Sequence, residues 1–106
     1  MNSFKSINTL FFNINDKNNF FSSIAEIKKE IKLKNIIIEL NEINFDEFLE
    51  DLNKLFIESK IHKRSFVIVK SDFKSDYYNL NIDIVPTLQE ASDIIEIEEI
   101  ERDLEI

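Results

Sequence analysis

The sequence predicts a single α/β domain over residues 1–106, with a mixed sheet of four to five strands and three or four helices in the order ββαβαβ(β)α. At 106 residues the chain has room for one hydrophobic core and not for two. The segments 35–40 (NIIIEL) and 65–70 (SFVIVK) are nearly continuous apolar runs, which are typical of inner parallel strands covered on both faces. Segments with a helical period alternate with them, so we expect parallel strands joined by right-handed crossovers.

The first part of the chain begins with β-rich residues and then changes to a helical period. We expect a hairpin of two strands at about 2–6 and 9–14, with Asn8 in the tight turn between them. Asp16 is a suitable N-cap for the first helix. The apolar stripe of this helix consists of Phe20, Ile24, Ile27 and Ile31.

The second helix follows the strand at 35–40 directly. Asn44 and Glu47 form a capping-box pair, and Ile43 and Phe48 have the spacing of a hydrophobic staple. We therefore expect Asn44 to be the N-cap of this helix and Asp46 to lie in its first turn. Its apolar stripe consists of Phe45, Phe48, Leu49, Leu52, Leu55 and Phe56.

The last part of the chain contains a short strand and a helix. Residues 81–85 (NIDIV) alternate between polar and apolar, which suits a strand at a sheet edge, and Pro86 ends it. Thr87 and Glu90 form another capping box. We therefore expect an acidic C-terminal helical segment over residues 87–106.

Composition excludes several classes of function. The chain has no glycine, so it has neither a P-loop nor a dinucleotide fingerprint, because both need the backbone to approach phosphate without a Cβ. We expect asparagine to take the positive-φ positions that glycine normally holds. Without cysteine there is no disulfide and no thiol chemistry. The sequence shows no secretory signal and no apolar run of membrane-spanning length, so we expect a cytoplasmic protein that does not bind a membrane.

The net charge of −8 is concentrated at the C-terminus. Residues 87–106 hold eight of the 21 acidic residues and one of the 13 basic ones. Because an acidic protein repels phosphate backbones, we expect no direct binding of nucleic acid.

The last helix carries apolar residues on two opposite sides. At 100° per residue, one stripe begins with Leu88, Ala91 and Ile95 and continues with Glu98, Glu99 and Arg102. The opposite side holds Ile97, Ile100 and Leu104. A straight helix cannot bury both sides, so either it bends near residues 96–98 and folds back on the domain, which we favour, or the second stripe contacts another molecule. In the second case Ile97, Ile100 and Leu104 dock on a protein partner or a second copy, and Glu98, Glu101 and Glu105 steer a basic partner.

The spans NIIIELNEINFDEFLEDLNKLFIESKIHKRSFVIVK and DIVPTLQEASDII resemble the STAS-like domains, relatives of the bacterial anti-sigma-factor antagonists. The resemblance implies a binding module that is switched by phosphorylation of a Ser or Thr at the start of the helix after the central strand. No hydroxyl residue occurs between Ile24 and Ser59, so this switch is absent. The degenerate switch region consists of Asn41, Asn44, Asp46 and Glu47. Its two acids could mimic a permanently phosphorylated state, but we favour the interpretation that they are ordinary partners of a helix dipole.

The ending VPTLQEASDIIEIEEIERDL is similar to that of a small bacterial family whose members are often labelled ribonuclease Z. A two-metal hydrolase of that class needs several histidines and aspartates around paired zinc ions, and His62 is the only histidine here. We therefore expect no nuclease activity of this chain's own, no metal and no cofactor.

These observations predict a non-catalytic protein-interaction or regulatory module of STAS-like type. A second possibility is a regulatory domain that binds a small ligand in the strand-end crevice near Asn41 to Asn44. A third is an accessory partner of an RNA-processing enzyme, linked to ribonuclease Z.

Overall fold

The computed structural model describes residues 8–40, 45–71 and 82–104. The elements in chain order are β1 (Thr9–Ile14), α1 (Lys17–Glu30), β2 (Asn35–Leu40), the 3₁₀ turn η1 (Phe45–Phe48), α2 (Leu49–Ile61), β3 (Phe66–Val69), β4 (Asp83–Val85) and α3 (Leu88–Leu104). The α/β class and the three α-helices agree with the prediction.

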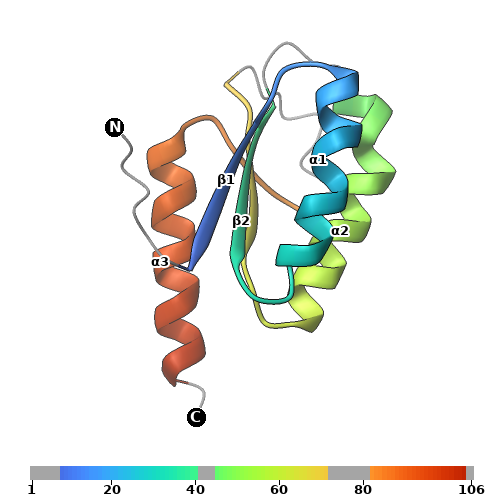
Figure 1. The fold of residues 1–106 in the computed structure, drawn as a ribbon. Helices are drawn as coiled ribbons and strands as arrows, with labels where there is room; N and C mark the ends of the chain where they lie inside the picture. Colours follow the sequence, from blue (N-terminus) through green and yellow to red (C-terminus); the bar gives the residue numbers. More distant parts are fainter. Residues whose placement is uncertain (1–7, 41–44, 72–81, 105–106) are drawn as a thin grey trace.

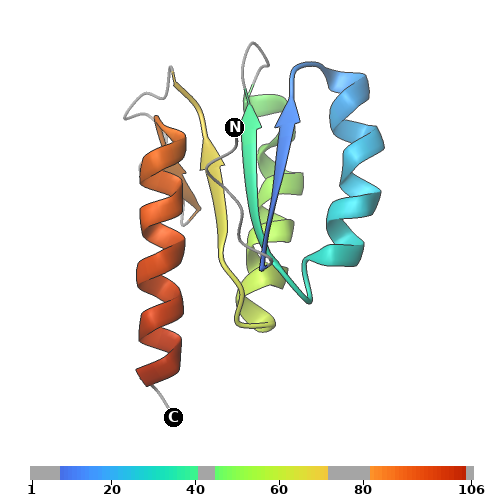
Figure 2. The same ribbon diagram turned by 60° about the vertical axis from the view of Figure 1, so that its left-hand side comes forward.

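The four described strands form one sheet in the order β1-β2-β3-β4, and every neighbouring pair is parallel. Helices α1 and α2 cover one face of the sheet and α3 covers the other (Figures 1 and 2). The three-residue strand β4 pairs with β3, as the prediction of a short edge strand requires. The strand expected at residues 2–6, which would make the sheet mixed, lies outside the described residues.

The core is divided between the two faces of the sheet. On the side of α1 and α2, the buried cluster includes Phe20, Ile38, Phe48 and Phe66. On the side of α3 it is smaller and consists of Ile37, Val67, Val69, Ala91 and Ile95. Alternate residues of β2 and β3 therefore point into different clusters, which is why both strands read as continuous apolar runs.

Helix α1 begins as predicted. The Asp16 side chain accepts a hydrogen bond from the Asn19 backbone N–H at 2.7 Å, which satisfies one of the free donors at the helix start. Phe20 and Ile27 are buried, and Ile31 is buried at the C-cap.

The second helix begins with a 3₁₀ turn in place of the α-helical turn expected after Asn44. A 3₁₀ turn occupies Phe45–Phe48, and α2 begins at Leu49 with Phe48 as an N-cap that makes no side-chain capping bond. The expected cap, Asn44, and the staple residue Ile43 lie outside the described residues. Phe48 is buried with its ring centroid 4.2 Å from that of Phe20, so packing against α1 fixes this end of the helix.

Helix α2 ends in a tight backbone turn at Lys63. The Arg64 N–H donates to the Ser59 carbonyl and the Lys63 N–H to the Lys60 carbonyl, which is the Schellman pattern. Lys63 has a φ of 59°, the only positive φ within the described residues, so the expectation that asparagine takes such positions is wrong here. The Cβ of Lys63 makes this conformation unfavourable, and the turn directs the chain into β3.

We predict that Lys63→Gly stabilises the protein by about 1 kcal/mol, or roughly 4 °C in Tm, because glycine removes the Cβ penalty at a left-handed position. A thermal melt followed by circular dichroism measures the change. Lys63→Ala is the matched control, since it removes the same charge and keeps the Cβ. Equal Tm values for the two variants would contradict the prediction.

Candidate interaction surface on the C-terminal helix

Helix α3 runs without interruption from Leu88 to Leu104. One half of its predicted capping box is present, because the Thr87 hydroxyl accepts a hydrogen bond from the Glu90 N–H at 3.2 Å. The same hydroxyl donates to the Glu90 carboxylate at 3.0 Å. The helix does not fold back near residues 96–98, so the favoured expectation is wrong.

The inner face of α3 is apolar in its first half. Ala91 and Ile95 are buried against Ile37, Val67 and Val69 of the sheet. Burial of one Ile contributes about 1.5–3 kcal/mol, so this half is held mainly by apolar contact.

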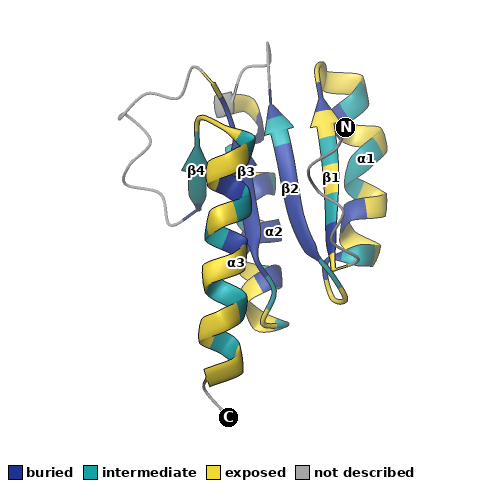
Figure 3. Cartoon of the chain, turned by 90° about the vertical axis from the view of Figure 1, so that its left-hand side faces the viewer, coloured by how far each residue is buried: buried dark blue, intermediate teal, exposed yellow. Residues whose placement is uncertain are grey.

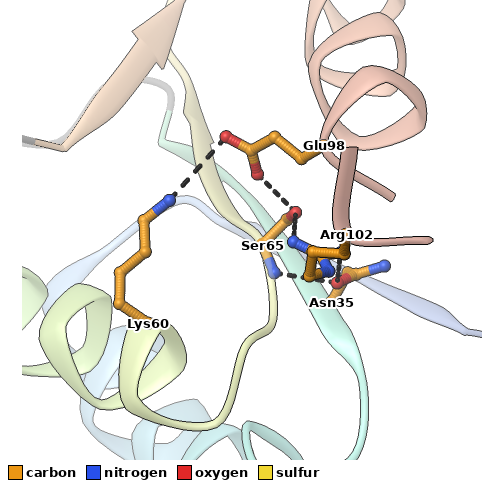
Figure 4. Close-up of polar contacts among 5 residues, drawn as sticks. All are labelled: Asn35, Lys60, Ser65, Glu98 and Arg102. Carbon is orange, nitrogen blue, oxygen red and sulfur yellow. Dashed lines mark hydrogen bonds and ion pairs between the residues drawn. The ribbon is translucent and has the colours of Figure 1, made fainter. Parts of the chain in front are cut away.

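The inner face becomes polar in the second half, where Glu98, Glu99 and Arg102 meet Asn35 and Ser65. We call these five residues the inner polar cluster. Figure 4 shows four of them, all but Glu99, together with Lys60. Asn35 opens β2 and Ser65 directly precedes β3, so they stand side by side at the start of two neighbouring parallel strands. Both are fully buried.

Hydrogen bonds within the inner polar cluster join α3 to both strands. Asn35 Nδ2 donates to Glu99 Oε2 at 2.6 Å, and Ser65 Oγ donates to Glu98 Oε1 at 2.5 Å. The Arg102 guanidinium donates to Ser65 Oγ at 3.2 Å and to Asn35 Oδ1 at 3.4 Å. Asn35 Oδ1 also accepts the Ser65 N–H at 2.8 Å. Each α3 member is charged, and hydrogen bonds to charged groups are the stronger ones, at about 1.5–3 kcal/mol each.

A second carboxyl group, Asp83 of β4, lies next to Glu98. Partial burial raises the pKa of Asp83 above its ordinary value of 3.8. The nearby Glu98 charge and a hydrogen bond to Glu98 raise that pKa further, while Lys60 opposes them. Lys60 Nζ lies 3.8 Å from Glu98 Oε2 and 5.2 Å from the centroid of the Phe56 ring.

The outer face of α3 has the opposite pattern. Ile97, Ile100 and Leu104 are 55%, 53% and 80% exposed, and we call them the outer apolar stripe. Figure 3 views the molecule from the side of α3 and shows how much of this helix is exposed. Glu101 is exposed as expected, whereas Glu98 is turned towards Ser65, so its expected role in steering a partner is wrong. Glu105 lies outside the described residues.

The degenerate switch region shows one ordinary surface contact. Glu47 is exposed and its Oε1 lies 3.4 Å from Lys17 Nζ at the start of α1. Asp46 belongs to the turn η1, and Asn41 and Asn44 lie outside the described residues. The small-ligand crevice expected near Asn41 to Asn44 is therefore also outside them.

A hollow of about 370 Å³ lies between α1 and α2. Its polar walls carry both signs of charge, from Lys28, Lys32 and Lys54 on one hand and Asp51 and Glu58 on the other. The mixture favours neither an anionic nor a cationic ligand.

Within the described ranges, no group of three His, Cys, Asp or Glu residues is arranged to hold a metal ion. None of the described helices is both long enough and apolar enough to cross a bilayer. Comparison with protein-family models, curated proteins and solved structures gives no match to this chain.

Asn35 and Ser65, the hydrogen-bond partners of α3, were not predicted as such from the sequence. The helical period correctly placed Glu98, Glu99 and Arg102 on the same side of the helix as Ala91 and Ile95. Asn35 and Ser65 were interpreted only as strand residues. One sequence signal could have indicated them. Asn35 and Ser65 each stand one position before the apolar run of a strand, and the two runs pair in parallel with Ile36 opposite Phe66, which places the two polar residues next to each other.

We predict that Asp83→Asn stabilises the protein at pH 7, because it removes a carboxylate whose ionised form burial and Glu98 make unfavourable. The folded state binds this proton more tightly than the unfolded state, so wild-type stability falls as pH rises from about 3.8 through the raised pKa. The advantage of the variant should shrink towards pH 4. Denaturant melts from pH 4 to 8 measure this dependence.

Asp93→Asn, on the exposed side of α3, is the charge-matched control for Asp83→Asn and should show a smaller gain at neutral pH. A gain for Asp83→Asn that is independent of pH, or equal to that of the control, would contradict the assignment.

Proposed function

We propose that this chain is a non-catalytic protein-interaction module of STAS-like type that contacts its partner through the outer apolar stripe of α3. The observation that carries the proposal is the exposure of three large apolar side chains at successive positions on one helix face. Single exposed apolar residues are ordinary, whereas a contiguous patch is typical of an interaction site.

The inner polar cluster supports a binding role for this face. It holds α3 in one rotation about its axis, because Glu98, Glu99 and Arg102 make their hydrogen bonds to Asn35 and Ser65 on the sheet side of the helix. A helix that is held in one orientation presents its outer side chains in one arrangement. Less conformational entropy is then lost when a partner binds to it.

The buried state of Ser65 supports a non-catalytic interpretation of the same cluster. Ser65 Oγ is bonded to a carboxylate and a guanidinium, a set that resembles an activated hydroxyl, but the residue is 0% exposed. A nucleophile needs an approach path for the substrate. We assign the Ser65 hydroxyl a structural role in holding α3.

The STAS-like part of the proposal is supported by the sequence resemblance and by the order β2, α2, β3, β4, α3. No hydroxyl residue is present in η1 or at the start of α2, so the module acts without a phosphorylation switch at that position.

We predict that Ile100→Asp with Leu104→Asp leaves stability nearly unchanged, within about 0.5 kcal/mol per substitution, because both side chains are already exposed. Ile95→Ala, on the inner face of the same helix, should cost about 2–5 kcal/mol. Thermal melts of the three proteins test this difference.

The same double variant tests binding. Ile57→Asp with Ile61→Asp is the matched control, because these α2 residues are 50% and 67% exposed. In pull-downs from a lysate of the source cells, a specific partner should be retained by wild type and by the α2 variant and lost by the α3 variant. Equal recovery by both variants, or loss of folding in the α3 variant, would count against the proposal.

A further inference from the structure

The outer apolar stripe has the spacing of a two-helix seam. Ile97, Ile100 and Leu104 are separated by three and four residues, which are the a, d and a positions of a heptad. In this frame Glu98, Glu99 and Arg102 take positions b, c and f, on the side away from the seam, and these are the residues bonded to Asn35 and Ser65. The contacts with the sheet therefore leave the seam face open to a second helix.

The residues that flank this seam are all acidic. Glu101 takes the e position, and Glu96 and Asp103 take the g positions on the other side. All three are exposed, and no salt bridge within the described part of the chain involves them. In paired helices the e and g residues determine which partner is accepted, through the charges they meet across the interface.

The flanking charges disfavour a second copy of this chain. In a parallel pair Glu96 would face Glu101 of the other copy, and in an antiparallel pair Glu101 would face Glu101. Both arrangements place like charges together beside the seam, and each molecule also carries a net charge of −8. Of the two occupants that the sequence left open, a homodimer and a basic partner, the charge pattern favours the second.

We infer that the α3 seam binds an amphipathic helix of another protein, with Leu or Ile on its apolar face and Lys or Arg at both flanking positions. This inference rests on the proposed function and names the partner's chemistry. The seam from residue 97 to 104 is about 10 Å long at ~1.5 Å per residue. Such a small contact forms a transient complex, in which electrostatic steering raises the association rate.

The test uses the full chain labelled with ¹⁵N and two synthetic three-heptad peptides. Both peptides have Ile and Leu at the seam positions, and one has Lys and the other Glu at every flanking position. The Lys peptide should shift amide resonances of residues 96–104, and its affinity should fall roughly tenfold between 50 and 500 mM NaCl. The Glu peptide should produce no shifts there.

A charge-reversed variant makes the test reciprocal. Glu96→Lys with Glu101→Lys changes one exposed residue on each flank and leaves the inner polar cluster intact. This variant should prefer the Glu peptide. Sedimentation of the unmodified chain alone should show a monomer, because the like charges remain.

Four results would overturn the inference: no binding of the Lys peptide, equal binding of both peptides, dimerisation through α3, or shifts at 96–104 caused by lipid vesicles and not by the Lys peptide. If the Lys peptide fails while the Ile100→Asp, Leu104→Asp variant still loses its cellular partner, the seam chemistry is wrong and the proposed function stands. If neither peptide nor variant has any effect, both are wrong.

Discussion

The hydrogen bonds of Asn35 and Ser65 to α3 are the interaction on which the arrangement of the C-terminal helix depends. These two side chains sit at the start of neighbouring strands, fully buried, and polar groups in such positions are costly without partners. Glu98, Glu99 and Arg102 supply those partners. The charged groups of α3 are in turn paired, by the strand ends and by Lys60, so the cluster stabilises the fold only as a complete set.

This pairing accounts for the exposed apolar residues on the opposite side. Only one face of α3 can lie against the sheet. In the second half of the helix this face carries Glu98, Glu99 and Arg102, so Ile97, Ile100 and Leu104 on the opposite face are exposed. Full burial of an Ile or Leu side chain contributes about 1.5–3 kcal/mol to stability. The fold does without most of this contribution at these three positions. Charged residues at those positions would be equally compatible with the observed contacts to the sheet. This exposed apolar face is the basis of the proposed contact with another protein, and its acidic borders are the basis of the proposal that the partner is a basic helix.

The sequence was most informative where one physical signal was strong and local. Continuous apolar runs located β2 and β3, and side-chain caps located the starts of α1 and α3. It was less informative at η1, where a 3₁₀ turn ends at Phe48 and the Phe48 ring packs on Phe20. The positive φ of Lys63 was also not predicted, because the turn contains neither glycine nor asparagine, the residue types that favour this conformation. The helical period found both faces of α3, but the choice between bending and exposure depended on Asn35 and Ser65, more than 30 residues away.

The most direct test of this account is a set of nuclear Overhauser measurements on the isotope-labelled full chain. We expect contacts between the Arg102 side chain and Ser65, continuous helical contacts to Leu104, and no contacts from the Ile97 or Ile100 methyl groups to the core. Methyl contacts between Ile100 and core residues such as Val67 would show that α3 bends and buries this face, and would contradict the account.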